Sequence, residues 1–186
     1  WAQENKRHRH LWPGINIGRI PGVRGAEETV DQIMVTRGMI AEDPGNVHWS
    51  VGSLARNDTL ATAVREGPYL QQALVPASPW LDARPPAAPT VEAERSGADV
   101  LVRWEHPDPG DVFRWVVYFR ADDEWRYRIC PRNERQVTIE MPSRGPAAGR
   151  GGREAAGTAA QIAEIAVSAV DRVGNESRLT FWRTAR

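Results

Sequence analysis

The chain has 186 residues, with 24 Lys and Arg balanced by 24 Asp and Glu, so its formal net charge is zero. This balance argues against a protein that coats nucleic acid or lies on a membrane surface, because either needs a basic excess. A hydrophobic fraction of 41% is typical of a globular chain. No apolar run approaches the roughly 20 residues of a membrane span, and a single cysteine, Cys130, excludes an intrachain disulfide.

The chain begins at Trp1, without an initiator methionine and without a signal-peptide pattern. Its polar opening leads directly into an apolar strand pattern, as in the middle of a protein. We therefore expect a fragment, whose missing targeting signals say nothing about localisation.

The first half alternates between strand and helix patterns. The expected elements are a strand over 11–18, a helix over 26–38, a strand over 46–51 and a helix over 58–66. The first helix carries an i, i+3, i+4 stripe of Val30, Ile33 and Met34. This order is typical of parallel βαβ units. Two units cannot cover both faces of a parallel sheet, so we expect this half to be physically incomplete.

A proline-rich segment, residues 83–89, is expected to be a stiff linker. Beyond it the patterns are nearly all strand, at the spacing of a β-sandwich. The expected strands are 100–105, 115–120, 125–129, 137–141, 165–169 and 179–182. The Gly/Ala/Arg-rich segment 142–160 predicts a long mobile loop, with a helical turn over 154–160 as the alternative.

Period-2 alternation also predicts the sandwich core, because alternate residues of a strand share one face. The expected core residues are Val102, Trp104, Trp115, Val117, Phe119, Val137, Ile139, Ile165 and Val167.

Three runs in the second half carry a family resemblance: 100–104, 114–119 and 166–177. The last is the most specific, because Ala-Val-Asp leads there into a Gly-Asn turn. Together they resemble a fibronectin type III module over residues 88–186, apart from the long loop. The sequence departs from that pattern at Ile165 or Ala163, where an aromatic residue is often found.

The first half carries a second resemblance, in the runs 11–15, 32–33 with Arg37, 45–50, 65–69 and 73–80. In this order they resemble the end of the catalytic barrel of bacterial family-ten-type glycosyl-hydrolase-like proteins, over about residues 6–82. The resemblance implies that Ile15 and Val47 open the last two strands of a truncated TIM barrel. It also implies a carbohydrate substrate, an extracellular or cell-envelope location, and catalytic carboxylates upstream of Trp1.

The expected fold class is therefore α/β plus all-β. Residues 1–82 are expected to be the end of an incomplete (β/α) barrel, 83–89 the linker, and 90–186 a fibronectin type III-like β-sandwich.

Strand parity selects candidate substrate-binding residues. The apolar set is expected to face the helices: Ile15, Ile17, Val47, Trp49 and Val51. The alternate residues should then point toward the barrel axis, and substrate groups cluster at the carboxyl ends of barrel strands. With Trp12 as an aromatic platform, the candidates are Trp12, Asn16, Arg19, His48 and Ser50. The alternative is that these side chains are ordinary packed or satisfied core groups.

The sequence shows no catalytic set, so the catalytic residues stay unknown. Glycoside hydrolysis usually needs two carboxylates, and neither expected strand presents one inward. The histidines do not show a metal-ligand spacing, and no strand leads into a glycine-rich phosphate loop. We therefore expect no metal and no cofactor, and we interpret Cys130 as a packed thiol.

Two functions stay open. The chain is either the C-terminal part of a secreted carbohydrate-active hydrolase, inactive by itself, or a non-catalytic module that binds a carbohydrate, a protein or a neighbouring domain. Inward carboxylates upstream would favour the first. An exposed aromatic row on the sandwich, for which Tyr118, Trp125 and Tyr127 are the candidates, would favour the second. Packing of those aromatics against a neighbouring domain is the alternative.

Overall fold

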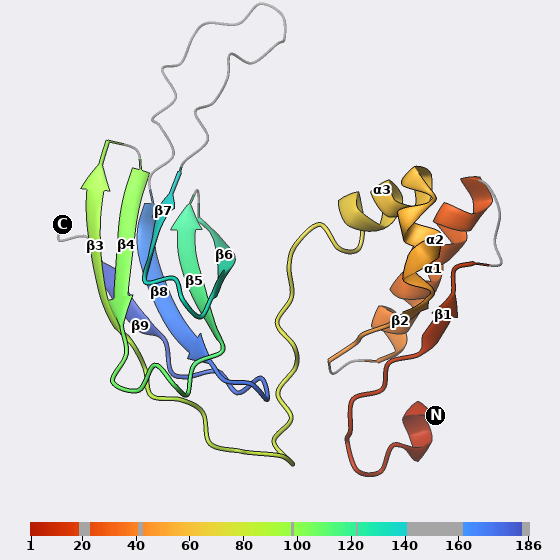
Figure 1. Cartoon of the computed structure of the whole chain (residues 1–186), viewed down its shortest axis with the longest axis horizontal. Coiled ribbons are helices and arrows are strands. Elements are labelled where there is room, and N and C mark those ends of the chain that lie inside the picture. The colour runs from red at the N-terminus through yellow and green to blue at the C-terminus, as the bar shows by residue number, and fades with distance from the viewer. Residues whose placement is uncertain (19–22, 41–42, 98, 122, 141–161, 184–186) are drawn as a thin grey trace, which may run out of the picture. The chain divides into compact units, whose positions relative to one another are not determined.

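The structure is a computed structural model of the chain. It describes residues 1–18, 23–40, 43–97, 99–121, 123–140 and 162–183. The chain divides into two compact units, Trp1–Pro76 and Ala77–Arg186, which are drawn in Figure 1 and described separately below. Arg19 and the expected mobile loop 142–160 lie outside the described residues.

The first unit contains the expected alternation of strands and helices. Its elements are η1 (Ala2–Glu4), β1 (Gly14–Asn16), α1 (Val23–Met39), β2 (Val47–Trp49), α2 (Val51–Ala55) and α3 (Asp58–Glu66). β1 and β2 are adjacent and parallel, as predicted. The short helix α2 was not predicted: Val51, expected in the strand, is its first residue, and Ser50 is its N-cap.

Local chemistry explains the bounds of α3. The Asn57 side chain accepts a hydrogen bond from the backbone N–H of Leu60 at 3.1 Å, which caps the start of the helix. Gly67 follows its last residue. Leu60 and Val64 are buried, as the predicted apolar face requires.

The predicted stripe of α1 was partly wrong. Ile33 is fully buried, but Met34 is 51% exposed. The buried side chains described in α1 are instead those of Ala26, Thr29, Ile33 and Thr36. The two threonine hydroxyls donate to the carbonyls four residues earlier, at 2.7 and 2.9 Å. Both threonines are therefore buried with their hydroxyls hydrogen-bonded. Because threonine is polar, the sequence pattern did not predict that these positions would be buried.

The core of the first unit lies between the helices and one face of the small sheet. Its buried members are Ile15, Ile17, Ala26, Ile33, Leu60 and Val64. The prediction that Val47, Trp49 and Val51 also face the helices was wrong, because all three are exposed. In the parallel register Ile15 lies beside His48, so His48 is on the helix side and Trp49 on the opposite face.

The second unit is a sandwich of two antiparallel sheets, as expected. Its strands are β3 (Thr90–Ser96), β4 (Asp99–Glu105), β5 (Arg114–Ala121), β6 (Glu124–Pro131), β7 (Gln136–Ile139), β8 (Ile162–Val170) and β9 (Thr180–Arg183). One sheet has the order β3-β4-β7 and the other β6-β5-β8-β9 (Figure 1). This arrangement is a fibronectin type III-like sandwich.

The predicted register of the sandwich is confirmed by its core. Every predicted core residue is buried except Phe119, which is half-buried and packs against the rest. The indole rings of Trp104 and Trp115 lie at the centre, with ring centroids 6.0 Å apart. Cys130 is buried beside them, as a packed thiol should be.

Residues 78–82, just before the proline-rich segment, are held on the sandwich by the turn after β8. The Asn175 side chain donates to the Asp82 carbonyl at 2.9 Å, and the Ser78 N–H donates to the Val173 carbonyl at 2.7 Å. The Asp171 carboxylate holds Asn175 by accepting from its N–H and from its side-chain amide, at 2.9 and 2.8 Å. The turn was predicted from the sequence, but its hold on the preceding segment was not.

Candidate functional site

An amide and an indole lie side by side at the carboxyl ends of the two parallel strands. Asn16 and Trp49 are direct register partners, so their side chains emerge on the same face. That face is opposite the one on which Ile15 is buried against the helices. Asn16 is exposed and Trp49 is 72% exposed. The pair therefore presents an aromatic surface next to a hydrogen-bonding group.

The chain turns directly after each of the two strands. The Asn16 side-chain oxygen accepts from the N–H of Gly18 at 3.3 Å. A Cβ at Gly18 would lie 3.1 Å from the hydroxyl oxygen of Ser53, so the close approach of this turn to α2 favours glycine. Ser50 turns the chain from β2 into α2 with extended backbone angles.

His48 lies away from this pair, contrary to the prediction that it shares a face with Asn16. Its Nε2 is 2.8 Å from the Tyr69 hydroxyl, and its Nδ1 has no hydrogen-bond partner among the described residues. Desolvation by burial lowers the pKa of His48, and it raises that of Tyr69. His48 is thus a packed group on the helix side.

Trp12 lies at the amino ends of the strands, before β1 begins. Its ring stacks on His10, with centroids 5.4 Å apart, and its Nε1 donates to the Asp43 carbonyl at 3.4 Å. It lines a groove of about 450 Å³ with Arg37 and Tyr69. Trp12 therefore does not share a site with Trp49. The structure instead brings Asn16 together with Trp49. The alternation of apolar residues had predicted that Trp49 faces the helices.

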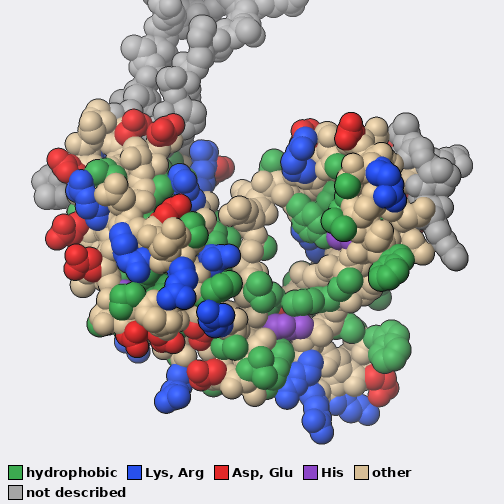
Figure 2. Space-filling model, viewed as in Figure 1, with side chains coloured by type: hydrophobic (Ala, Val, Ile, Leu, Met, Phe, Trp, Pro, Cys, Tyr) green, Lys and Arg blue, Asp and Glu red, His purple; other side chains and the backbone are tan. Residues whose placement is uncertain are grey.

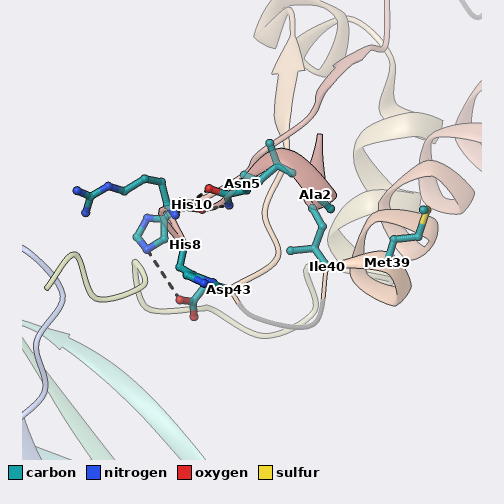
Figure 3. Close-up of a pocket in the computed structure, with 9 residues that line it drawn as sticks. Ala2, Asn5, His8, His10, Met39, Ile40 and Asp43 are labelled. Carbon is teal, nitrogen blue, oxygen red and sulfur yellow. Dashed lines mark hydrogen bonds and ion pairs between the residues drawn. The ribbon is translucent and has the colours of Figure 1, made fainter. Parts of the chain in front are cut away.

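A second pocket lies beside the N-terminal segment (Figure 3). It has a volume of about 270 Å³, and its lining includes Asn5, His8, His10 and Asp43. The His10 Nε2 is 3.8 Å from an Asp43 carboxylate oxygen. Nowhere in the described residues do three or more His, Cys, Asp or Glu side chains gather as a metal site would require.

The sandwich carries a separate group of aromatic side chains, of which Trp125, Tyr127 and Phe181 are exposed and Tyr118 is half-buried. Tyr118 packs against Tyr127 with ring centroids 6.2 Å apart, and Trp125 packs against Phe181 at 6.4 Å. Phe181 was not among the predicted residues, because it comes from β9, far along the chain. On the face of the sandwich visible in Figure 2, basic and acidic side chains are interspersed.

None of the helices described is long and apolar enough to cross a membrane. β1 (Gly-Ile-Asn) and β2 (Val-His-Trp) contain no carboxylate, so the two strands supply no acid–base pair. What Asn16 and Trp49 can do chemically is bind an uncharged ligand by ring stacking and hydrogen bonding.

No family model and no curated protein matches this sequence. Among solved structures, the chain is similar to the Clostridium perfringens spore cortex lytic enzyme SleM, with 20% identity and a TM-score of 0.38. That match covers 55% of this chain and 28% of SleM, so this chain spans little more than a quarter of SleM's length. An FN3 domain of human collagen XX matches with 14% identity and a TM-score of 0.36, covering 60% of this chain and all of that domain. The FN1–FN3 domains of chicken CNTN1 match with 15% identity and a TM-score of 0.36, covering 55% of this chain and 32% of theirs.

Proposed function

We propose that the first unit is the end of a (β/α) barrel in a glycoside-hydrolase-like protein, and that Asn16 and Trp49 form part of its carbohydrate site. The observation that carries this proposal is their juxtaposition on the uncovered face of two parallel strands, at the carboxyl ends. Carboxyl ends of parallel barrel strands are where substrates bind in this architecture.

The exposed face of the sheet formed by β1 and β2 supports the barrel proposal. Parallel sheets occur almost only with both faces covered, yet Val47 and Trp49 are exposed on one face of this sheet. Further strands closing a barrel would surround that face. The resemblance of residues 6–82 to the end of a family-ten-type glycosyl-hydrolase-like barrel supports the same arrangement.

The chemistry of the pair fits a sugar. A pyranose ring has an apolar face of C–H groups that packs on an indole, and hydroxyls around its rim that hydrogen-bond to an amide, which both donates and accepts. Arg19 and Ser50, which follow the two strands, remain candidates for the same site. The catalytic carboxylates would come from other strands of the barrel, so we expect this chain alone to hydrolyse nothing.

In this proposal the sandwich is an accessory domain, and the whole protein acts outside the cell or at its envelope. The experiment is to express the protein encoded by the whole reading frame and to measure release of reducing ends from polysaccharides. Trp49→Ala should lower kcat/KM on the order of 10- to 100-fold, since each ~1.4 kcal/mol of lost binding to the transition state is tenfold.

The matched control is Trp12→Ala, at the other end of the strands, which should leave kcat/KM within about twofold. Absence of glycan hydrolysis by the whole protein would contradict the proposal. Equal losses from the two tryptophan variants would contradict the assignment of Trp49 to the site.

A further inference from the structure

The outer face of the sheet β6-β5-β8-β9 carries four aromatic side chains in two packed pairs, Tyr118 with Tyr127 and Trp125 with Phe181. One row across the sheet runs through register partners: Tyr127 on β6, Tyr118 on β5, Ala166 on β8 and Phe181 on β9. Their side chains emerge on the face opposite the buried Trp115, Val117 and Val167.

The ring of Trp125 extends this row across the sheet. Trp125 is on β6 and Phe181 on β9, and these strands are three inter-strand spacings apart, or about 14 Å. Their ring centroids are nevertheless 6.4 Å apart. Both side chains must therefore lean over the strands between them, where Ala166 is fully buried.

Both rings nevertheless stay open to solvent on one side. Trp125 and Phe181 are each 48% exposed. With one side packed over the sheet, each ring turns much of its remaining surface outward. Exposed aromatic side chains that gather from several strands often mark a binding site.

The described charged side chains around these rings have partners within the domain, and their carboxylates outnumber their cations. The Arg120 guanidinium pairs with the Glu164 carboxylate at 3.4 Å and with Asp123 at 3.2 Å. The Tyr118 hydroxyl donates to the Glu176 carboxylate at 2.7 Å, and the Ser168 hydroxyl donates to the same oxygen. Carboxylate oxygens accept hydrogen bonds from sugar hydroxyls, and their negative charge disfavours an anionic polymer. The surface therefore favours a ligand that carries hydroxyls and no negative charge.

We propose that this aromatic surface, defined by Tyr118, Trp125, Tyr127 and Phe181, binds an uncharged polysaccharide chain. The apolar faces of successive sugar rings pack on the aromatic rings, and the hydroxyls at their rims reach the paired polar groups. This second site is separate from Asn16 and Trp49 and does not depend on the barrel.

The test is native gel electrophoresis of the 186-residue chain through gels with and without hydroxyethylcellulose, xyloglucan or glycol chitin. We expect at least one of these neutral polymers to slow the chain. Trp125→Ala and Phe181→Ala should each weaken that retardation at least tenfold in apparent Kd, whereas Trp125→Phe, which keeps a ring, should lose less.

One control separates this surface from the first unit. Trp1→Ala removes an exposed indole that lies in neither proposed site, and it should leave the retardation unchanged. If Trp49→Ala lowers kcat/KM for hydrolysis by the whole protein and Trp125→Ala weakens the retardation, both proposals stand. If hydrolysis is absent and the Trp125-dependent retardation persists, only the barrel proposal fails.

Circular dichroism of each variant verifies folding. If Trp125→Ala does not fold, the ¹⁹F resonance of 5-fluorotryptophan at position 125 in the otherwise unchanged chain should shift on addition of the retarding polymer. The proposal is overturned if no polymer slows the chain, or if retardation is independent of both Trp125 and Phe181. It is also overturned if these rings serve only self-association, seen as concentration-dependent sedimentation that Trp125→Ala abolishes without changing retardation.

Discussion

At the residue scale, the two core tryptophans dominate the sandwich. Trp104 is 2% exposed and packs against Trp115, and both rings lie between the sheets. The Nε1 of Trp104 has no hydrogen-bond partner within the described part of the chain, so its contribution is packing rather than hydrogen bonding. Burial of a side chain this large gives the sandwich much of its hydrophobic stabilisation.

Trp104→Ala should therefore destabilise the sandwich by about 3–5 kcal/mol, the range for large-to-small substitution of core aromatics. Urea unfolding followed by circular dichroism measures the change. Leu81→Ala, at an exposed position of the same unit, should change the free energy of unfolding by less than about 0.5 kcal/mol. A loss below about 1 kcal/mol for Trp104→Ala would contradict the packing described.

Cys130 gives a pH prediction of its own. Burial, with the nearby Glu134 carboxylate, raises the pKa of its thiol from 9.0 to about 11. The folded state therefore favours the protonated thiol. Its contribution to the free energy of unfolding is complete below pH 9 and is lost as the pH rises toward 11. Cys130→Ala should make the melting temperature fall less steeply between pH 9 and 11, as differential scanning fluorimetry can show. If the melting temperatures of the two proteins fall equally steeply with pH, Cys130 does not contribute to this pH dependence.

At the element scale, the periodicity of apolar residues accounts for most of what could be predicted. α3 has the predicted bounds, and the sandwich strands follow their alternating residues because one face of each is buried. The parity of β2 could not be predicted, because Val47 and Trp49 look like core residues. Which face of a short strand is covered depends on its register with β1, and thus on tertiary structure.

The site was predictable only in part for the same reason. Asn16 was predicted correctly because β1 has one clearly apolar face. The two faces of β2 are opposite to the prediction, so Trp49, and not His48, lies beside Asn16 on the open face. Phe181 joins Trp125 only through the order of the strands in the sheet, which separate sequence patterns do not specify. Local pattern thus identified elements, while contacts between distant elements decided which side chains meet.

The turn after β8 supplies an element-scale prediction. Asp171→Ala removes the acceptor that holds Asn175, and the Asn175 amide holds the Asp82 carbonyl. A partly buried amide that loses its partner costs about 1–3 kcal/mol. We expect faster cleavage within residues 77–89 in limited proteolysis, compared with Asp111→Ala at an exposed position. An unchanged cleavage rate would mean that the other contacts suffice to hold the segment.

At the scale of the whole molecule, the two units differ in how much core they contain. The first unit has one small cluster of buried residues beneath a two-stranded sheet, whereas the second has two sheets around a continuous core. A chain of under 80 residues buries a smaller fraction of its surface than a larger domain does, and an exposed apolar sheet face favours association.

Expressed separately, residues 77–186 should therefore unfold in one cooperative transition, whereas residues 1–76 should aggregate or melt without cooperativity. Calorimetry and sedimentation velocity distinguish these behaviours. A monomeric first unit with a sharp melting transition would show that its bare sheet face needs no covering strands.

We propose that the face bearing Trp49 is the inside of a barrel, where a sugar binds, and this proposal predicts when Trp49 is accessible to solvent. Hydroxyl-radical footprinting with mass spectrometry measures the solvent accessibility of Trp49 directly. In the 186-residue chain Trp49 should be oxidised rapidly, as its exposure requires. In the protein encoded by the whole reading frame it should be protected, and protected further by a bound oligosaccharide. Equal oxidation of Trp49 in both proteins, with or without the sugar, would contradict the account.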